Sequence, residues 1–160
     1  MTLLFQSSDN DLHVKWSGTV LKGKLVSCLL TLSSQPFSAH LEGDESLKTL
    51  LPVFKQWFVD YYNKKNSDIS LPFLIEKPEF TSKVLKELLA IPFGKVASYK
   101  DIAQRVRQPK AYRGVGQACH RNPFPLVIPC HRVVSHNGSL GGFALPLVLK
   151  TQLLKFEKAI

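Results

Sequence analysis

Cysteine and long apolar runs are scarce in this sequence, and each shortage excludes a class of protein. Three cysteines among 160 residues are too few for a disulfide-rich fold and favour a reducing compartment, the cytoplasm. The longest apolar runs, such as residues 145–149, span only a few positions, whereas a membrane helix needs about 20. Asp9 and Asp11 interrupt the N-terminal segment, which lacks the basic, apolar and small-residue order of a signal peptide. We therefore expect no membrane span and no membrane partner.

Acidic residues are scarce in only one part of the chain. Residues 1–71 contain seven Lys or Arg and seven Asp or Glu, whereas residues 72–160 contain fourteen and five. The formal net charge of +9 therefore lies entirely in the second part. Between Lys95 and Arg132 there are eight basic residues and one acid, Asp101. Such a stripe is typical of a surface that binds a polyanion, most often nucleic acid, although on charge alone a merely soluble basic face is equally compatible.

The composition predicts a folded protein. Hydrophobic residues make up 44% and charged residues 21% of the chain, as in ordinary globular domains, and 160 residues suffice for one domain or two small ones. Residues 11–41 are rich in β-forming residues and are divided by Gly18, Gly23 and Pro36. A helix should follow, with Pro52 in its first turn and with aromatic residues at helical spacing: Phe54, Trp57, Phe58 and Tyr61.

The second half of the chain is mostly helical in its patterning. An amphipathic pattern predicts a helix over residues 80–89. Ser98 can cap a further helix, and Asp101, three residues later, would complete a capping box. After a break at residues 108–110, a helix with several small residues is expected from residue 112 to about residue 120. Two short helices joined by a tight turn are typical of the helix-turn-helix motif.

Gly114, near the start of that second helix, has two interpretations. A small residue lets the backbone approach the wall of a DNA groove, and it equally lets two helices pack tightly, which is the commoner reason. The whole pattern predicts an α/β (α+β) fold in two domains. Residues 1–71 would form a small N-terminal β-sheet with a covering helix. Residues 72–160 would form a mostly helical C-terminal domain that contains the helix-turn-helix and the segment around Cys130.

That segment is constrained by proline and presents a cysteine. Residues 122–134 contain three prolines, so they cannot form a helix, and a short apolar run ends at Cys130, followed by His131 and Arg132. A base or a positive charge beside a thiol lowers its pKa from about 8.5 and favours the thiolate. We therefore interpret Cys130 as a reactive residue. The alternative is a buried structural cysteine, the role expected for Cys28.

His131 and Glu157 can support the reactivity of Cys130. Adjacent side chains of an extended chain point to opposite faces, so Cys130 and His131 need not touch unless the backbone turns there. His131 is therefore expected to accept the proton of Cys130 through a water molecule. The base itself needs an orienting group, usually a carboxylate. Glu157, on a last helix that Pro146 can begin, is our preferred candidate, although the residues alone favour a solvated glutamate.

Several motifs of this half resemble one known family. Residues 128–133, Ile-Pro-Cys-His-Arg-Val, resemble the active-site signature of the O6-alkylguanine-DNA alkyltransferases, also called methylated-DNA–protein-cysteine methyltransferases. Other segments follow in the order and spacing of that family: Ile91 to Tyr99, Asp101 to Ala103, Arg113 to Gly116, Asn122-Pro123, and Lys150 with Leu153, Leu154 and Glu157. The resemblance covers roughly residues 73–160.

The resemblance implies DNA repair by direct reversal. Cys130 would take the alkyl group from O6-alkylguanine, and from O4-methylthymine, in double-stranded DNA, irreversibly and once per molecule, after the base is flipped out. His131 would act as the base through water, with Glu157 hydrogen-bonded to it. Asn122 would hold the turn between the helix-turn-helix and the reactive segment, and Arg132 would tie its loop to the rest of the domain.

The resemblance also implies which residues bind DNA and the damaged base. Arg113 would enter the duplex where the base has left, and Tyr99 would crowd the neighbouring phosphate and donate a hydrogen bond to the guanine. Backbone groups of Cys130 and Val133 would hold the edge of the base. The implied substrate- and DNA-binding residues are Tyr99, Lys100, Arg113, Gly114, Val133 and Ala144.

One segment departs from the family. Where members commonly have Tyr-Ser/Gly-Gly-Gly before the last helix, this chain has Phe143, Ala144, Leu145 and Pro146. We expect Leu145 to narrow the guanine pocket, so that methyl adducts react more readily than benzyl adducts.

We expect no metal and no cofactor. Some relatives bind structural zinc in the N-terminal domain, but here that part offers only Cys28, His13 and His40, too few for a four-ligand site. The chain also has no glycine-rich loop of the phosphate-binding kind, which makes a nucleotide cofactor unexpected.

Three alternatives to a monomeric, cytoplasmic repair protein deserve comparison. A non-catalytic damage-binding module would share the scaffold but lack the acceptor, and Cys130 argues against it. A helix-turn-helix regulator that senses alkylation normally needs an effector domain or a dimer, for which 160 residues leave little room. A cysteine hydrolase usually has a glycine-rich turn at its nucleophile, which the proline before Cys130 does not fit.

Overall fold

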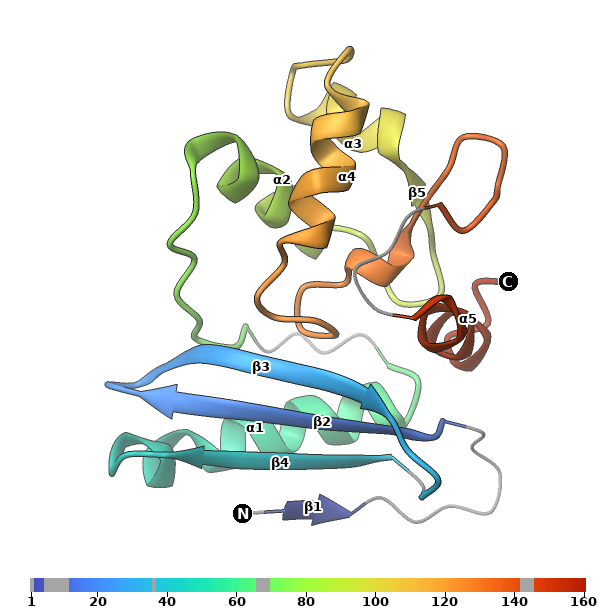
Figure 1. The fold of residues 1–160 in the computed structure, drawn as a ribbon. Coiled ribbons are helices and arrows are strands. Elements are labelled where there is room, and N and C mark those ends of the chain that lie inside the picture. The colour runs from blue at the N-terminus through green and yellow to red at the C-terminus, as the bar shows by residue number, and fades with distance from the viewer. Residues whose placement is uncertain (1, 5–11, 36, 66–69, 142–145) are drawn as a thin grey trace. The chain divides into compact units, whose positions relative to one another are not determined.

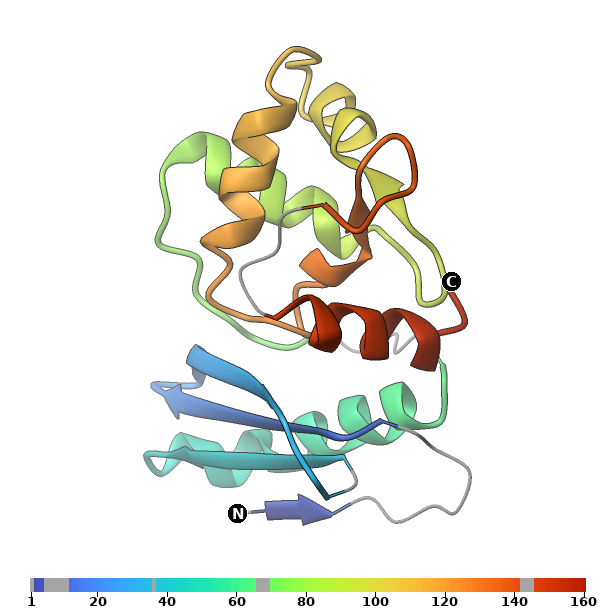
Figure 2. The same ribbon diagram turned by 45° about the vertical axis from the view of Figure 1, so that its right-hand side comes forward.

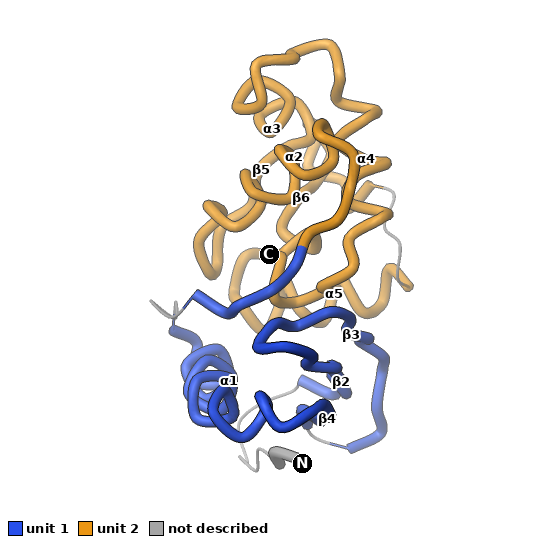
Figure 3. Tube along the Cα trace, turned by 90° about the vertical axis from the view of Figure 1, so that its left-hand side faces the viewer, with its two compact units in different colours: residues 1–74 blue, residues 75–160 orange. Residues whose placement is uncertain are grey.

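The computed structural model describes residues 2–4, 12–35, 37–65, 70–141 and 146–160. These fall into two compact units, residues 1–74 and residues 75–160, which Figure 3 shows in two colours. The boundary predicted from the sequence, after residue 71, lies three residues before this division.

The first unit is built on a four-stranded sheet. Its strands are β1 (Thr2–Leu4), β2 (Val14–Leu21), β3 (Lys24–Leu32) and β4 (Ser38–Gly43), in the order β1-β4-β2-β3 (Figure 1). Strands β2 and β4 run parallel, and the other neighbours run antiparallel. A two-residue turn joins β2 to β3, with φ of 48° at Lys22 and 73° at Gly23. Two left-handed residues give the turn that matches the twist of a hairpin.

A helix covers one face of this sheet, as the sequence predicted. Helix α1 (Ser46–Tyr62) runs along the sheet (Figure 2). Alternate residues of β2, among them Val14, Trp16 and Val20, are fully buried. The ring centroids of Trp16 and Phe58 lie 4.7 Å apart in an edge-to-face arrangement, which adds to the burial of apolar area.

The predicted start of α1 was wrong. The helix begins at Ser46, so Pro52 lies inside it rather than in its first turn. The carboxylate of Asp44 explains the earlier start, because it accepts hydrogen bonds from the backbone N–H of Ser46 at 3.0 Å and of Lys22 at 2.8 Å. Asp44 thus satisfies a donor of the first turn and ties it to the hairpin. Proline is tolerated at position 52 on the exposed side, at the loss of one helical hydrogen bond.

The second unit is mostly helical, as predicted. Its elements are α2 (Glu79–Leu89), β5 (Ala97–Ser98), α3 (Tyr99–Arg105), α4 (Tyr112–His120), a single 3₁₀ turn η1 (Cys130–Arg132), β6 (Val133–Val134) and α5 (Leu147–Phe156). Strands β5 and β6 form a short parallel pair, with Ala97 opposite Val133. This pair places the residues that follow Cys130 directly beside the start of α3.

The helix-turn-helix is formed by α3 and α4. Ser98 caps α3 through the predicted capping box: its Oγ accepts from the Asp101 N–H at 3.1 Å, and its own N–H donates to the Asp101 carboxylate at 2.8 Å. Gly114 faces α2, where a Cβ atom would lie 3.0 Å from the ring of Phe80. Close packing of α4 on α2 is therefore one reason for its small size. No helix in the described part of the chain combines the length and apolarity needed to span a bilayer.

Gly18 offers a test of packing in the first unit. A Cβ atom at Gly18 would lie 2.3 Å from the Trp16 ring and 2.9 Å from Leu25, and both side chains are fully buried. Gly18→Ala should therefore lower the free energy of unfolding by about 1–3 kcal/mol, measured by urea denaturation. Ser17→Ala, at the next position, is the matched control and should stay within about 0.5 kcal/mol of the wild type. Equal effects of the two variants would contradict this account.

Candidate active site

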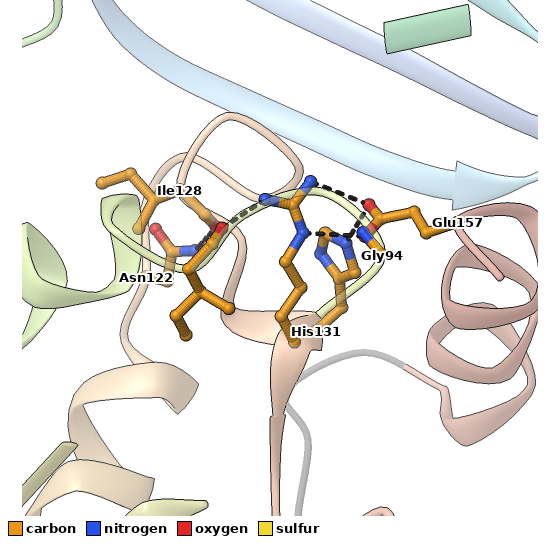
Figure 4. A network of polar contacts seen from close by, with 7 residues as sticks. Gly94, Asn122, Ile128, His131 and Glu157 are labelled. Atoms are coloured by element: carbon orange, nitrogen blue, oxygen red, sulfur yellow. Dashed lines mark hydrogen bonds and ion pairs between the residues drawn. The ribbon is translucent and has the colours of Figure 1, made fainter. Parts of the chain in front are cut away.

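Cys130 begins the 3₁₀ turn η1, and Asn122 holds it there. The side-chain amide of Asn122 donates to Cys130 Sγ at 3.1 Å and to the Ile128 carbonyl at 2.8 Å, while its oxygen accepts from the Phe124 N–H at 3.0 Å. Figure 4 shows Asn122 beside Ile128. Cys130 is only 3% exposed. Asn122 thus fixes the loop before the cysteine and presents an N–H donor to its sulfur.

Burial raises the pKa of the Cys130 thiol, although the hydrogen bond from Asn122 and the charge of Lys150 oppose the increase. The expectation that neighbouring positive charge would favour the thiolate was therefore wrong for the resting protein. The guanidinium of Arg132, two residues after the cysteine, is paired with Glu157 rather than with the sulfur. The resting thiol is protonated and needs a base to become a nucleophile.

Glu157 joins His131 to Arg132. One carboxylate oxygen lies 2.8 Å from His131 Nε2, and the other accepts from Arg132 Nε at 2.8 Å. A second guanidinium nitrogen of Arg132 reaches Glu157 at 3.0 Å, and the third donates to the Ile91 carbonyl at 2.7 Å. The N–H of Gly94 also points to this carboxylate, at 3.4 Å. In Figure 4, His131 and Glu157 point toward one another, with Gly94 next to them.

The pKa values of Glu157 and His131 are both lowered, which favours an ionised carboxylate beside a neutral imidazole. Burial alone would raise the pKa of Glu157, but the contacts with His131 and Arg132 outweigh it and lower the pKa to about 2. Burial lowers the pKa of His131 more than the carboxylate raises it. A neutral imidazole that donates Nε2–H to Glu157 keeps a lone pair on Nδ1. Within the described chain, Nδ1 is buried and has no hydrogen-bond partner, so it can accept a proton.

Lys150 is a member of this site to which the sequence analysis gave no role. Its side chain is fully buried, and its ammonium donates at 2.5 Å to the carbonyl of Val133 and at 2.5 Å to that of Leu140. Burial lowers its pKa to about 8, while the two neighbouring cysteine thiols, Cys130 and Cys119, oppose the decrease. Its signal in the sequence was a lysine among the leucines on the core face of the predicted last helix.

Tyr99 lies between two glycines at the start of α3. A Cβ atom on Gly116 of α4 would lie 3.8 Å from the tyrosine ring, and one on Gly141 would lie 2.8 Å from it. Gly141 has φ of 66°, so both its conformation and its neighbour require glycine. Burial, and then the thiols of Cys119 and Cys130, raise the pKa of Tyr99 to about 12. The hydroxyl therefore keeps its proton at neutral pH.

The remaining predicted site residues lie on different parts of the unit. Cys130, His131, Glu157 and Asn122 are brought together by the contacts above, and Val133 is buried in β6. Lys100 on α3 and Arg113 on α4 are exposed and take part in none of those contacts. Ala144, with Phe143 and Leu145, lies outside the described residues.

The described residues contain no cluster of three or more His, Cys, Asp or Glu side chains placed to hold a metal ion. The polar atoms around Cys130 are instead committed to one another, as an amide on the sulfur and a carboxylate between an imidazole and a guanidinium.

Known proteins that match this chain carry one name repeatedly. Residues 79–159, about half of the chain, match the family model described as 6-O-methylguanine DNA methyltransferase, DNA binding domain. The methylated-DNA–protein-cysteine methyltransferase of Methanocaldococcus jannaschii is 38% identical over 149 residues, which cover 88% of this chain and 87% of that protein. The protein of the same name from Methanosarcina mazei is 42% identical over 98 residues, which cover 61% of this chain and 62% of that protein, less than two thirds of its length.

Solved structures support the fold. The crystal structure of Mycobacterium tuberculosis OGT in complex with DNA matches with a TM-score of 0.68 over 90% of this chain and 92% of that chain, at 23% sequence identity. At this identity the likeness concerns the fold alone. It confirms the predicted mixed α/β class, with a small N-terminal sheet and a helical C-terminal part.

Glu157→Gln tests the buried charge pair. The pKa of Glu157 is lowered from 4.5 to about 2, so its stabilising effect is complete above about pH 4.5 and is lost as the pH falls toward about 2. The variant should be less stable than the wild type at neutral pH, on the order of 3 kcal/mol, and this difference should shrink across that acidic range. Urea unfolding at a series of pH values measures it, with the exposed Glu76→Gln as control. A difference that does not change with pH would refute the assignment.

Proposed function

The chain belongs to the methylated-DNA–protein-cysteine methyltransferase family, and from that membership we propose that it repairs alkylated DNA by direct reversal. Cys130 takes the alkyl group from O6-alkylguanine, or from O4-methylthymine, in double-stranded DNA, and the protein works as a monomer in the cytoplasm. The observation that carries the proposal is the buried Cys130 thiol beside Asn122, followed directly by a histidine whose Nδ1 is ready to accept a proton.

The first step is removal of the thiol proton. His131 Nδ1 accepts it through a water molecule, and Glu157, paired with Nε2 at 2.8 Å, stabilises the imidazolium that results. The buried Lys150 ammonium and the Asn122 amide, 3.1 Å from the sulfur, favour the thiolate once it forms. A thiol that is inert at rest thereby becomes a nucleophile only within the complete site.

In the second step the sulfur of Cys130 attacks the alkyl carbon. The S–C bond forms as the C–O6 bond breaks, and guanine leaves with the bonding electrons. Tyr99, protonated because its pKa is about 12, donates a proton to the departing base, which neutralises the charge as it develops. Tyr99 then regains a proton from the imidazolium by way of solvent. The product is a thioether, which water does not hydrolyse, so each molecule acts once.

The exposed cations of the helix-turn-helix supply the affinity for DNA. Lys100 and Arg113 are exposed on α3 and α4, in the half of the chain that holds all the excess positive charge. Contacts of this kind are made mainly to phosphates and weaken with salt. The target base lies inside the duplex and must be flipped out, which costs a few kcal/mol; Arg113 fills the gap and offsets part of the lost stacking. Gly114 lets the start of α4 come close to the groove.

A damage-binding module and an alkylation-sensing regulator are the competing functions. A damage-binding module needs no base poised to deprotonate the cysteine, whereas a regulator that senses alkylation at Cys130 would need one and normally requires an added effector domain or a dimer. The pairing of a neutral His131 with Glu157 and Arg132, all at most 8% exposed, is costly to assemble in an apolar core. Such an arrangement is expected where proton transfer is required, which favours the acceptor over a protein that only binds.

The first test is intact mass after mixing the protein with duplex DNA that carries one O6-methylguanine. The protein should gain the mass of one methylene group, in proportion to the damaged DNA added and never beyond one equivalent, because the thioether is final. Cys130→Ala should show no gain, and Cys28→Ala, the matched control, should behave like the wild type. Tight binding of the DNA without any mass gain in the wild type would instead support the damage-binding module.

Gly141→Ala tests the part assigned to Tyr99. Its Cβ atom would lie 2.8 Å from the tyrosine ring, whereas one on Gly138, which also has a left-handed φ (79°), would meet nothing within 4 Å. The two variants thus share the backbone cost but only one displaces the ring. Gly141→Ala should slow single-turnover methyl transfer by about 10- to 100-fold, and Gly138→Ala should leave the rate near that of the wild type. Equal rates in the two variants would remove Tyr99 from the mechanism.

A further inference from the structure

The second unit contains another buried thiol that the proposed mechanism does not use. Cys119 lies near the end of α4 and is 2% exposed, as deeply buried as Cys130 at 3%. Both are free thiols, and the third cysteine, Cys28, belongs to β3 of the first unit. A lone buried cysteine is ordinarily a small apolar core residue. Two buried cysteines in one core, one of which is the proposed nucleophile, can instead react with each other.

Asn122 connects the two cysteines. Its backbone N–H donates to the Cys119 carbonyl at 3.2 Å, and its side-chain amide donates to Cys130 Sγ at 3.1 Å. The residue that holds the acceptor sulfur is therefore bonded directly to the turn of helix that carries Cys119. The intervening loop is short, so little chain entropy opposes a link between its two ends.

The direction of the Cys119 side chain follows from its helix. Gly116 lies one turn earlier on the same face of α4, and that face meets the ring of Tyr99, 3.8 Å from the Cβ position of Gly116. The electrostatic pattern agrees with this direction. Cys130 adds to the rise that burial causes in the pKa of Cys119, and both thiols act on Tyr99 and on Lys150. Both thiols thus lie near enough to Tyr99 and Lys150 to act on them electrostatically.

We propose that Cys119 and Cys130 close into a reversible disulfide when a hydroperoxide oxidises the site, which withholds the acceptor from alkyl transfer. The Cys130 thiolate attacks the peroxide oxygen, the O–O bond breaks, and an alcohol or water leaves with the thiol proton. The resulting sulfenic acid is then attacked by the Cys119 sulfur. The S–S bond forms as the S–O bond breaks, and the oxygen leaves as a second water with the Cys119 proton.

The disulfide protects a residue that can be used only once. Without a second thiol, a sulfenic acid proceeds to sulfinic and sulfonic acids, which are irreversible. A disulfide is instead returned to two thiols by the thiol reductants of a reducing compartment. That a hydroperoxide can reach the buried Cys130 rests on the proposed function, because a site that admits an alkylated base also admits the smaller hydroperoxide.

Peptide mapping after oxidation tests the link directly. Trypsin cuts after Arg113, Arg121 and Arg132, so Cys119 and Cys130 fall in separate peptides, residues 114–121 and 122–132. The full-length chain is treated with hydrogen peroxide, blocked with N-ethylmaleimide in denaturant and digested. We expect these two peptides to be joined, and dithiothreitol to separate them. Failure to find this pair, or a link of either peptide to the one that contains Cys28, would overturn the proposal.

Recovery of function separates protection from simple damage. After peroxide and then dithiothreitol, the wild type and the Cys28→Ser control should regain methyl acceptance, whereas Cys119→Ser should not, because its Cys130 has been oxidised irreversibly. Cys119→Ala repeats the measurement with a residue that suits the core. Equal recovery with and without Cys119 would refute the protective role. If the untreated wild type accepts no methyl group, the proposed function fails, while the peptide map still decides the disulfide.

Discussion

The carboxylate of Glu157 is the group on which the second unit depends. It accepts hydrogen bonds from His131 and Arg132, and Arg132 extends the link to the carbonyl of Ile91. The end of α5, the turn that carries Cys130 and the segment after α2 are thereby held through one buried charge. A buried ion is tolerated only when it is paired and hydrogen-bonded. The same contacts that satisfy Glu157 orient the histidine, so stability and reactivity share one set of atoms.

Burial both protects and restrains the acceptor. It raises the pKa of Cys130 and lowers that of His131, so thiol and imidazole are both neutral at rest. A free thiolate in this position would react readily with electrophiles, whereas the neutral thiol does not. The Asn122 amide and the Lys150 ammonium oppose the cost of charging the sulfur. Cys130 is therefore neutral at rest, with groups of the same unit in place that favour its ionisation.

Local sequence signals predicted much of this structure. Three features depend on neighbouring residues and could be predicted from the sequence: the capping box at Ser98 and Asp101, the apolar spacing of α2 and the bounds of α4. The family resemblance pointed to Glu157 as the partner of His131. The features that the sequence did not predict depend on contacts between residues that are distant in the sequence. Asp44 moved the start of α1, burial reversed the expected pKa shift of Cys130, and the fit of Gly141 against Tyr99 has no local signature.

The separation in sequence between Glu157 and its partners has a consequence during synthesis. His131 and Arg132 precede it by 26 and 25 residues, so a ribosome extends the chain through Cys130 and its base well before it adds the carboxylate. The ribosome adds about 5–20 residues per second, and domains fold as their residues emerge. For a second or more the nascent chain thus contains His131 and Arg132 without the carboxylate that pairs with them. The buried contacts around Glu157 are therefore among the last parts of the second unit that can form.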